Sequence, residues 1–180
     1  MTSPQPPDPS YPPSAPASPT LAEALGVTRP HPPLFTWPPD THLALAMMAA
    51  LPVWLALGLL LGPHLRAPPG AWAWVSLVLV QPLLEELVFR GLLQGQALVW
   101  LQRGGRPMRL GPLTLANALV TVAFVALHLR AQPLAWALAV AVPSLVFGHL
   151  RERFSSVWPA VGVHAFYNAG FGLTAWLVLA

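Results

Sequence analysis

Hydrophobic residues dominate the chain from about residue 41 onward, in long runs separated by short stretches rich in Pro, Gly and Arg. A membrane-spanning helix needs about 20 mostly apolar residues. Five segments fit that pattern, at about 43–61, 71–101, 113–129, 134–149 and 157–179. The pattern therefore predicts an all-α fold, a polytopic membrane helix bundle of about five transmembrane helices.

The first 40 residues follow a different pattern, in which Pro recurs every few positions. Proline removes a backbone donor and breaks helical hydrogen bonding, so the stretch is typical of a disordered or polyproline-like chain. Only residues 21–27 have room for one or two helical turns. We expect a disordered Pro-rich tail over residues 1–40 and a transmembrane helical domain over residues 41–180.

The second hydrophobic segment is longer than one membrane span requires. Trp72 and Trp100 bracket it, and tryptophan favours the membrane–water interface. At a rise of 1.5 Å per residue the two are about 42 Å apart, whereas a hydrocarbon core is about 30 Å thick. We expect this helix to be tilted, to be kinked at Pro82, or to extend out of the bilayer.

Composition supports a membrane protein and excludes several kinds of site. Charged residues make up only 8% of the chain and hydrophobic residues 55%, with a mean hydropathy of +0.58, whereas soluble domains carry about 25% charged residues. There is no cysteine, which excludes disulfides, thiolate zinc sites and cysteine nucleophiles. All nine basic residues are Arg, so lysine-based Schiff-base chemistry is excluded as well.

The arginines are distributed unevenly between the loops, which predicts an orientation. With five spans, one set of loops would share a side with the N-terminal tail, and the other set would carry only Arg66 and Arg130. The basic residues on the tail side are Arg103, Arg106, Arg109, Arg151 and Arg153. The positive-inside rule then places the N-terminus in the cytoplasm. The high pI thus reflects membrane topology, and we expect no nucleic-acid partner.

Two carboxylates and one arginine lie inside the second hydrophobic segment. Glu85, Glu86 and Arg90 would each cost at least about 2.5 kcal/mol at mid-membrane, so they should face the bundle interior and have partners. Glu86 and Arg90 have the i,i+4 spacing of a helical ion pair. Glu85 lies about 100° around the helix and is the candidate free carboxylate. A purely structural salt-bridge network is the competing interpretation.

Further polar residues in apolar segments favour a functional site. His128 follows Phe124 by four residues, and Asn168 follows His164 by the same interval, so each pair shares a helix face. A glutamate beside a histidine can take a proton from water, and a histidine with an asparagine can donate to an oxyanion. Two histidines and a glutamate could also ligate zinc. No HExxH or GxSxG motif and no pair of intramembrane aspartates is present.

These residues resemble three motifs of the CPBP intramembrane proteases, the family of the CAAX prenyl endopeptidase, also called Abi proteins. Residues 85–90 match EExxxR, residues 124–128 match FxxxH, and residues 164–168 match HxxxN/D. The motifs occur in order, on separate predicted helices, within about residues 71–180. The resemblance implies an endopeptidase of the bacterial cell membrane that acts on membrane-associated proteins or peptides.

The resemblance also implies a role for each motif residue. Glu85 would be the general base, and His128 would help to activate water. His164 and Asn168 would form the oxyanion site, with Glu86, Arg90 and Phe124 in support. We expect no metal cofactor, although a divalent ion such as zinc stays an alternative. Two other functions remain open: a non-catalytic membrane scaffold or immunity protein of the same fold, and a small transporter.

Overall fold

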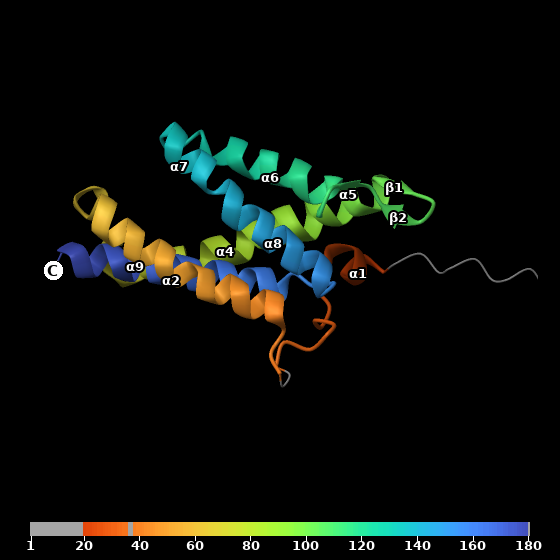
Figure 1. The fold of residues 1–180 in the computed structure, drawn as a ribbon, viewed down its shortest axis with the longest axis horizontal. Helices are drawn as coiled ribbons and strands as arrows, with labels where there is room; N and C mark the ends of the chain where they lie inside the picture. Colours follow the sequence, from red (N-terminus) through yellow and green to blue (C-terminus); the bar gives the residue numbers. More distant parts are fainter. Residues whose placement is uncertain (1–19, 36–37, 180) are drawn as a thin grey trace, which may run out of the picture.

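A computed structural model describes residues 20–35 and 38–179, and helices account for most of them (Figure 1). The main helices are α2 (Thr41–Leu61), α6 (Leu115–His128), α8 (Ala141–Arg153) and α9 (Trp158–Leu179). A further long helix, Gly70–Trp100, is assembled from α3 (Gly70–Val75), α4 (Gln81–Glu86), α5 (Gln94–Trp100) and the wider segments η2 (Ser76–Val80) and η3 (Leu87–Leu93). The predicted all-α membrane bundle is confirmed.

All five predicted hydrophobic segments form helices, but the number of membrane spans is approximate. Within the described residues, three helices are long and apolar enough to cross a membrane: Thr41–His64, Gly70–Trp100 and Leu134–Arg153. The 14-residue α6 is about 21 Å long, which is shorter than a hydrocarbon core. The segment predicted at 134–149 is divided at Val140 into α7 (Leu134–Ala139) and α8, and it continues to Arg153.

The long second helix accommodates Pro82 through a wider turn. Proline has no N–H, and its ring collides with the carbonyl four residues earlier in a regular α-helix. Here the π-helical segment η2 ends just before Gln81, and Pro82 occupies an early position of α4. A second π-helical segment, η3, begins directly after Glu86. Such wide turns change the angular spacing of side chains, and they are frequent at functional sites.

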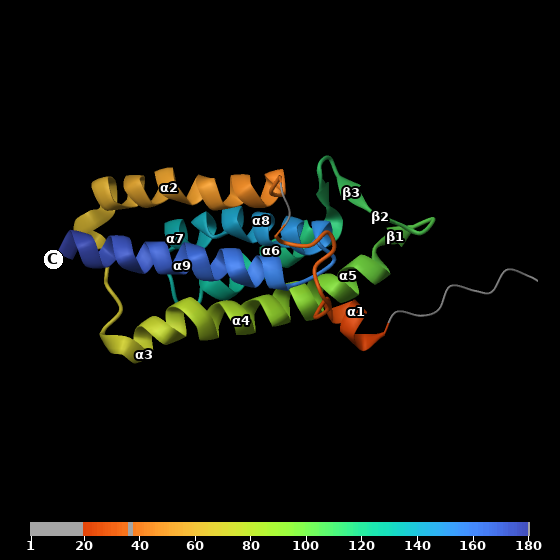
Figure 2. The same ribbon diagram turned by 90° about the horizontal axis from the view of Figure 1, so that it is seen from below.

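Helix α9 runs through the bundle between α2 and the long second helix (Figure 2). Small residues allow this close packing, because Gly170 lies against the ring of Trp54 and Gly172 against that of Trp74. A cluster of buried side chains from α2, α8, the residue that follows α8, and α9 forms the main core: Ala46, Phe147, Leu150, Phe154, Ala160 and Val163. Its packing fixes α9 relative to α8, and with it the polar residues of both helices.

Two short hairpins join α5 to α6. Strand β1 (Gln102–Arg103) pairs with β2 (Arg106–Pro107), and β3 (Arg109–Leu110) pairs with β4 (Leu113–Thr114). The first turn contains Gly104 and Gly105 with φ values of 56° and 74°, which glycine adopts readily. The hairpins lie at the same end of the bundle as α1 (Leu21–Leu25), opposite the C-terminus (Figure 2).

The described part of the N-terminal segment packs on the bundle, and its helix α1 lies within residues 21–27, where the sequence left room for one or two helical turns. Residues 1–19 and 36–37 lie outside the described residues. Helix α1 has a capping box formed by Thr20 and Glu23. The backbone carbonyl of Ala24 accepts a hydrogen bond from Arg151 and lies so close to Gly95 that a Cβ there would collide with it. The absence of a side chain at Gly95 therefore allows α1 to pack closely against the second helix.

Candidate active site

Two charged residues of the second helix, Glu86 and Arg90, form a buried centre with His164 of α9. Glu86 and Arg90 are fully buried, and His164 is 7% exposed. Glu86 Oε2 lies 3.1 Å from Arg90 Nε, and Glu86 Oε1 lies 2.9 Å from His164 Nδ1. The ion pair that the i,i+4 spacing predicted is therefore present. Both oxygens of Glu86 are engaged by protein groups.

Arg90 has a second polar partner and an aromatic enclosure. Its Nη2 donates to Ser144 Oγ at 2.9 Å. The guanidinium carbon lies 5.2 Å from the ring centre of Phe124 and 5.9 Å from that of Phe147. Cations are attracted to aromatic faces at such distances. Glu86, Ser144 and the two rings together offset the cost of burying this charge.

Glu85 is placed differently from its neighbour. Its side chain is 26% exposed, and its Oε2 lies 3.9 Å from His164 Nε2. That separation is longer than a hydrogen bond, so the carboxylate keeps its capacity to accept from another group. Because Glu86 is fully engaged, Glu85 is the carboxylate of the pair that a water molecule or a substrate can reach.

His128 presents one free ring nitrogen. Its Nδ1 lies 2.9 Å from the carbonyl oxygen of Phe124. A carbonyl can only accept, so Nδ1 carries the proton, and in the neutral ring Nε2 is left as an acceptor. The ring also packs on Phe124 with centres 4.5 Å apart, and it lies within electrostatic range of Glu85. The FxxxH pair thus fixes the orientation of a histidine that interacts electrostatically with Glu85.

His164 is held on one face by a stacked ring and on one edge by a carboxylate. It stacks on Phe147 with ring centres 4.7 Å apart and an interplanar angle of 18°. Glu86 accepts from Nδ1, which directs Nε2 toward Glu85. The structure thus brings Glu85 of the second helix and His164 of α9 together at one site.

Asn168 is one turn beyond His164, but its amide bonds the helix backbone. Its Nδ2 donates to the carbonyl oxygen of Leu77 at 3.0 Å. Leu77 belongs to the π-helical segment η2. One N–H of the amide is therefore used to hold α9 against the second helix. The other N–H and the amide oxygen are the groups that could serve a substrate.

Within residues 20–35 and 38–179, no group of three His, Cys, Asp or Glu side chains is arranged to hold a metal ion. The closest approach to a ligand set is His164 with Glu85 and Glu86, in which one histidine nitrogen is already bonded to Glu86. The expectation that the protein uses no metal stays a prediction.

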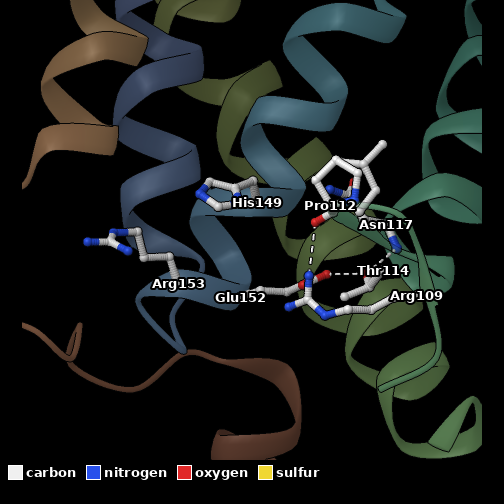
Figure 3. Close-up of a pocket in the computed structure, with 8 residues that line it drawn as sticks. Arg109, Pro112, Thr114, Asn117, His149, Glu152 and Arg153 are labelled. Atoms are coloured by element: carbon white, nitrogen blue, oxygen red, sulfur yellow. Dashed lines mark hydrogen bonds between the residues drawn. The ribbon is translucent and has the colours of Figure 1, made fainter. Parts of the chain in front are cut away.

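A second polar cluster, which the sequence interpretation did not include, lies near the hairpins. Glu152 accepts hydrogen bonds from Gln94 at 2.7 Å and from Thr114. Together with Arg109 and His149 it lines a cavity of about 270 Å³ (Figure 3). Glu152 lies near the end of a predicted apolar segment, and its position there was the one available signal. Isolated polar residues at segment ends are common, so that signal was weak.

Comparisons with known proteins identify the family. A family model described as type II CAAX prenyl endopeptidase Rce1-like matches residues 67–170. No curated protein and no solved structure matches the chain. The matched region contains all the motif residues, from Glu85 to Asn168, and the three apolar helices agree with an integral membrane protein. Since the match covers more than half of its residues, the chain belongs to the family of Rce1-like type II CAAX prenyl endopeptidases.

Proposed function

We propose that this protein is a glutamate-type intramembrane endopeptidase that hydrolyses peptide bonds of membrane-associated proteins or peptides. The observation that carries the proposal is the difference between the two adjacent glutamates. Glu86 is buried, with one oxygen paired with Arg90 and the other with His164, whereas Glu85 is partly exposed, lies 3.9 Å from His164 and interacts electrostatically with His128. An exposed carboxylate with histidine neighbours is the usual equipment of a general base.

In the proposed reaction, Glu85 and His128 activate a water molecule. The water oxygen attacks the carbonyl carbon of the substrate while the Glu85 carboxylate takes a proton from the water. His128 Nε2 accepts a hydrogen bond from the same water and orients it, because Nδ1 is held by Phe124. Glu85 then passes its proton to the leaving amide nitrogen as the C–N bond breaks. Loss of such a base typically costs about 10²- to 10⁴-fold in rate.

His164 and Asn168 would stabilise the negative charge that develops on the carbonyl oxygen. In this proposal His164 is the doubly protonated imidazolium, in which Nδ1–H donates to Glu86. Its Nε2–H and the unused N–H of Asn168 then donate to that oxygen. Their positions are supported by two fixed contacts: His164 Nδ1 with Glu86, and Asn168 Nδ2 with the carbonyl of Leu77. Donors that are held in place before the reaction are the effective ones, because they need no reorganisation.

The orientation of the protein is part of the proposal. The described arginines of the hairpins and of the C-terminal end of α8 lie at the end of the bundle where α1 also lies (Figure 2). Arg66 and Arg130 belong to loops near the other end. The positive-inside rule then supports a cytoplasmic N-terminus in a bacterial cell membrane.

One observation favours a non-catalytic scaffold of the same fold as a second candidate. The bond from Asn168 to Leu77 and the bond from Arg90 to Ser144 both join helices, so the polar centre also stabilises packing. For a scaffold, the carboxylate of Glu85 would be dispensable, because its contact with His164 Nε2, at 3.9 Å, is too long for a hydrogen bond. The two candidates therefore differ in what they predict for Glu85.

The proposal is tested by comparing the termini of membrane proteins in cells that produce wild type or Glu85→Gln at matched abundance. Mass spectrometry would identify new N- and C-termini. We expect cut products with wild type that are absent with Glu85→Gln. Glu23→Gln, the same change on the exposed helix α1, is the matched control and should behave as wild type. Identical termini with wild type and Glu85→Gln, both folded, would favour the scaffold.

A further inference from the structure

A line of hydrogen bonds leads from the buried centre to helix α6 through two hydroxyl groups. Ser144 Oγ accepts from Arg90 Nη2 at 2.9 Å and lies 2.9 Å from Thr121 Oγ1. Thr121 Oγ1 in turn lies 3.5 Å from Asn117 Oδ1. Ser144 is fully buried and Thr121 is 6% exposed, so water does not replace these partners. The line joins α9, the second helix, α8 and α6.

Each hydrogen bond along this line is donated in the same direction, from Arg90 toward Asn117. Asn117 Nδ2 donates to the carbonyl of Leu145 at 3.0 Å, so its Oδ1 is the atom that faces Thr121. Thr121 then donates to Asn117, and its own oxygen accepts from Ser144. Ser144 in turn accepts from Arg90, which has only donors. Ser144 thus donates to Thr121 and accepts from Arg90, so the hydroxyl of Thr121 fixes the direction of the Ser144 O–H and turns a Ser144 lone pair toward the guanidinium.

The hydrogen bond to Ser144 determines how the guanidinium plane of Arg90 is turned relative to its ion pair with Glu86. Phe124 and Phe147 attract the guanidinium, but a ring face fixes its plane poorly. Within the described residues, Nε and Nη1 of Arg90 have no hydrogen-bond partner, and the contact of Nε with Glu86 is an ion pair at 3.1 Å. Ser144 thus supplies the directional hydrogen bond of the guanidinium in this part of the chain. The position of Glu86 in turn fixes Nδ1 of His164.

We infer that Thr121 and Ser144 are positioning residues for the catalytic centre, acting on His164 through Arg90 and Glu86. The inference rests on the proposed function, because it assigns them to the same reaction. Neither hydroxyl reaches the substrate. Their role is to hold the guanidinium so that Glu86 accepts from Nδ1 and Nε2 stays directed at the reacting oxygen. Outer partners of this kind typically contribute about 10- to 100-fold in activity.

The test compares two substitutions of Thr121 that separate its hydroxyl from its methyl group. Thr121→Val keeps the shape and removes the hydroxyl, whereas Thr121→Ser keeps the hydroxyl and removes the methyl. Both variants are expected to have a lower melting temperature, since each loses a buried contact. Stability alone therefore does not distinguish positioning from packing, and the readout has to report on His164.

The first readout is the ¹⁵N signal of the His164 imidazole in purified, ¹⁵N-histidine-labelled protein, assigned by its absence in His164→Gln. We expect Thr121→Val to shift the Nδ1 signal and Thr121→Ser to leave it as in wild type. Unchanged signals in Thr121→Val, or equal shifts in both variants, would overturn the inference. This readout needs no substrate, so it remains decisive even if the proposed protease function fails.

The second readout is cleavage of a peptide spanning a cut site mapped in the comparison of termini. We expect Thr121→Val to lower kcat about tenfold with little change in KM, and Thr121→Ser to restore kcat. A change confined to KM, or equal losses of kcat in both variants, would contradict positioning. A wild-type protein without any cleavage would instead defeat the proposed function.

Discussion

At the scale of single residues, Arg90 is the group on which the buried centre depends most. It is fully buried, pairs with Glu86, donates to Ser144 and lies between two aromatic rings. Removing one partner of a buried ion pair leaves the other charge without compensation, which is far more costly than removing both. The arginine is thus a structural requirement of the site, whichever function the site serves.

We expect Arg90→Ala to lower the free energy of unfolding by about 3–5 kcal/mol, because Glu86 would stay buried without its cation. The double variant Arg90→Met with Glu86→Gln should lose less than Arg90→Ala alone. Denaturant unfolding of purified protein in micelles measures both. A loss below about 1 kcal/mol in Arg90→Ala would show that the buried pair contributes little.

At the scale of elements, Asp40 joins two helices at the hairpin end of the bundle. It caps α2 by accepting from the backbone N–H of His42 and Leu43, each at 3.1 Å. It also accepts from Arg153 of α8, with Nη2 2.6 Å and Nε 2.8 Å from Oδ2. The hydrogen bond from Arg153 lowers the pKa of the Asp40 carboxyl from its ordinary value.

This pair predicts a defined dependence of stability on pH. Since the pKa of folded Asp40 is lowered, its contribution is complete above the ordinary value of about 4 and is lost as the pH falls through the lower pKa. Asp40→Asn keeps a capping side chain but removes the charge. The difference in melting temperature between wild type and this variant should be constant from pH 7 to 5 and shrink below pH 4. A difference that grows on acidification would contradict the assignment.

Several elements could be predicted from the sequence, and others could not. Helix positions followed from the length of the apolar runs, and the Glu86–Arg90 pair followed from its spacing. The π-helical turns around α4 could not be predicted. Pro82 indicates that helical hydrogen bonding is interrupted, but it does not indicate how the helix adapts. The docking of α1 depends on long-range contacts of Ala24 with Gly95 and Arg151, which a five-residue helix does not reveal.

At the scale of the whole molecule, the bundle has two unlike ends. One end carries α1, both hairpins and most of the described arginines, and the other carries the C-terminus and the loops around Arg66 and Arg130 (Figure 2). Asp40 and Arg153 lie at the first end, where α2 begins and α8 finishes. The arginine asymmetry between the ends is the basis for the proposed cytoplasmic N-terminus.

Single-cysteine labelling tests this orientation directly, because the natural chain contains no cysteine. Gln102 lies in the first hairpin, and Gln132 lies in the loop between α6 and α7; both are exposed. A membrane-impermeant thiol reagent should label Gln132→Cys in intact cells and Gln102→Cys only after the membrane is opened. The reverse pattern would place the N-terminus outside.

The most direct measurement of the central claim is the rate at which purified protein in lipid vesicles cleaves a peptide spanning a cut site mapped in cells. Wild type, Glu85→Gln and the control Glu23→Gln would be compared at equal amounts of folded protein. We predict that Glu85→Gln loses at least about 10²-fold in rate while Glu23→Gln retains wild-type activity. Cleavage by Glu85→Gln at the wild-type rate would contradict Glu85 as the general base.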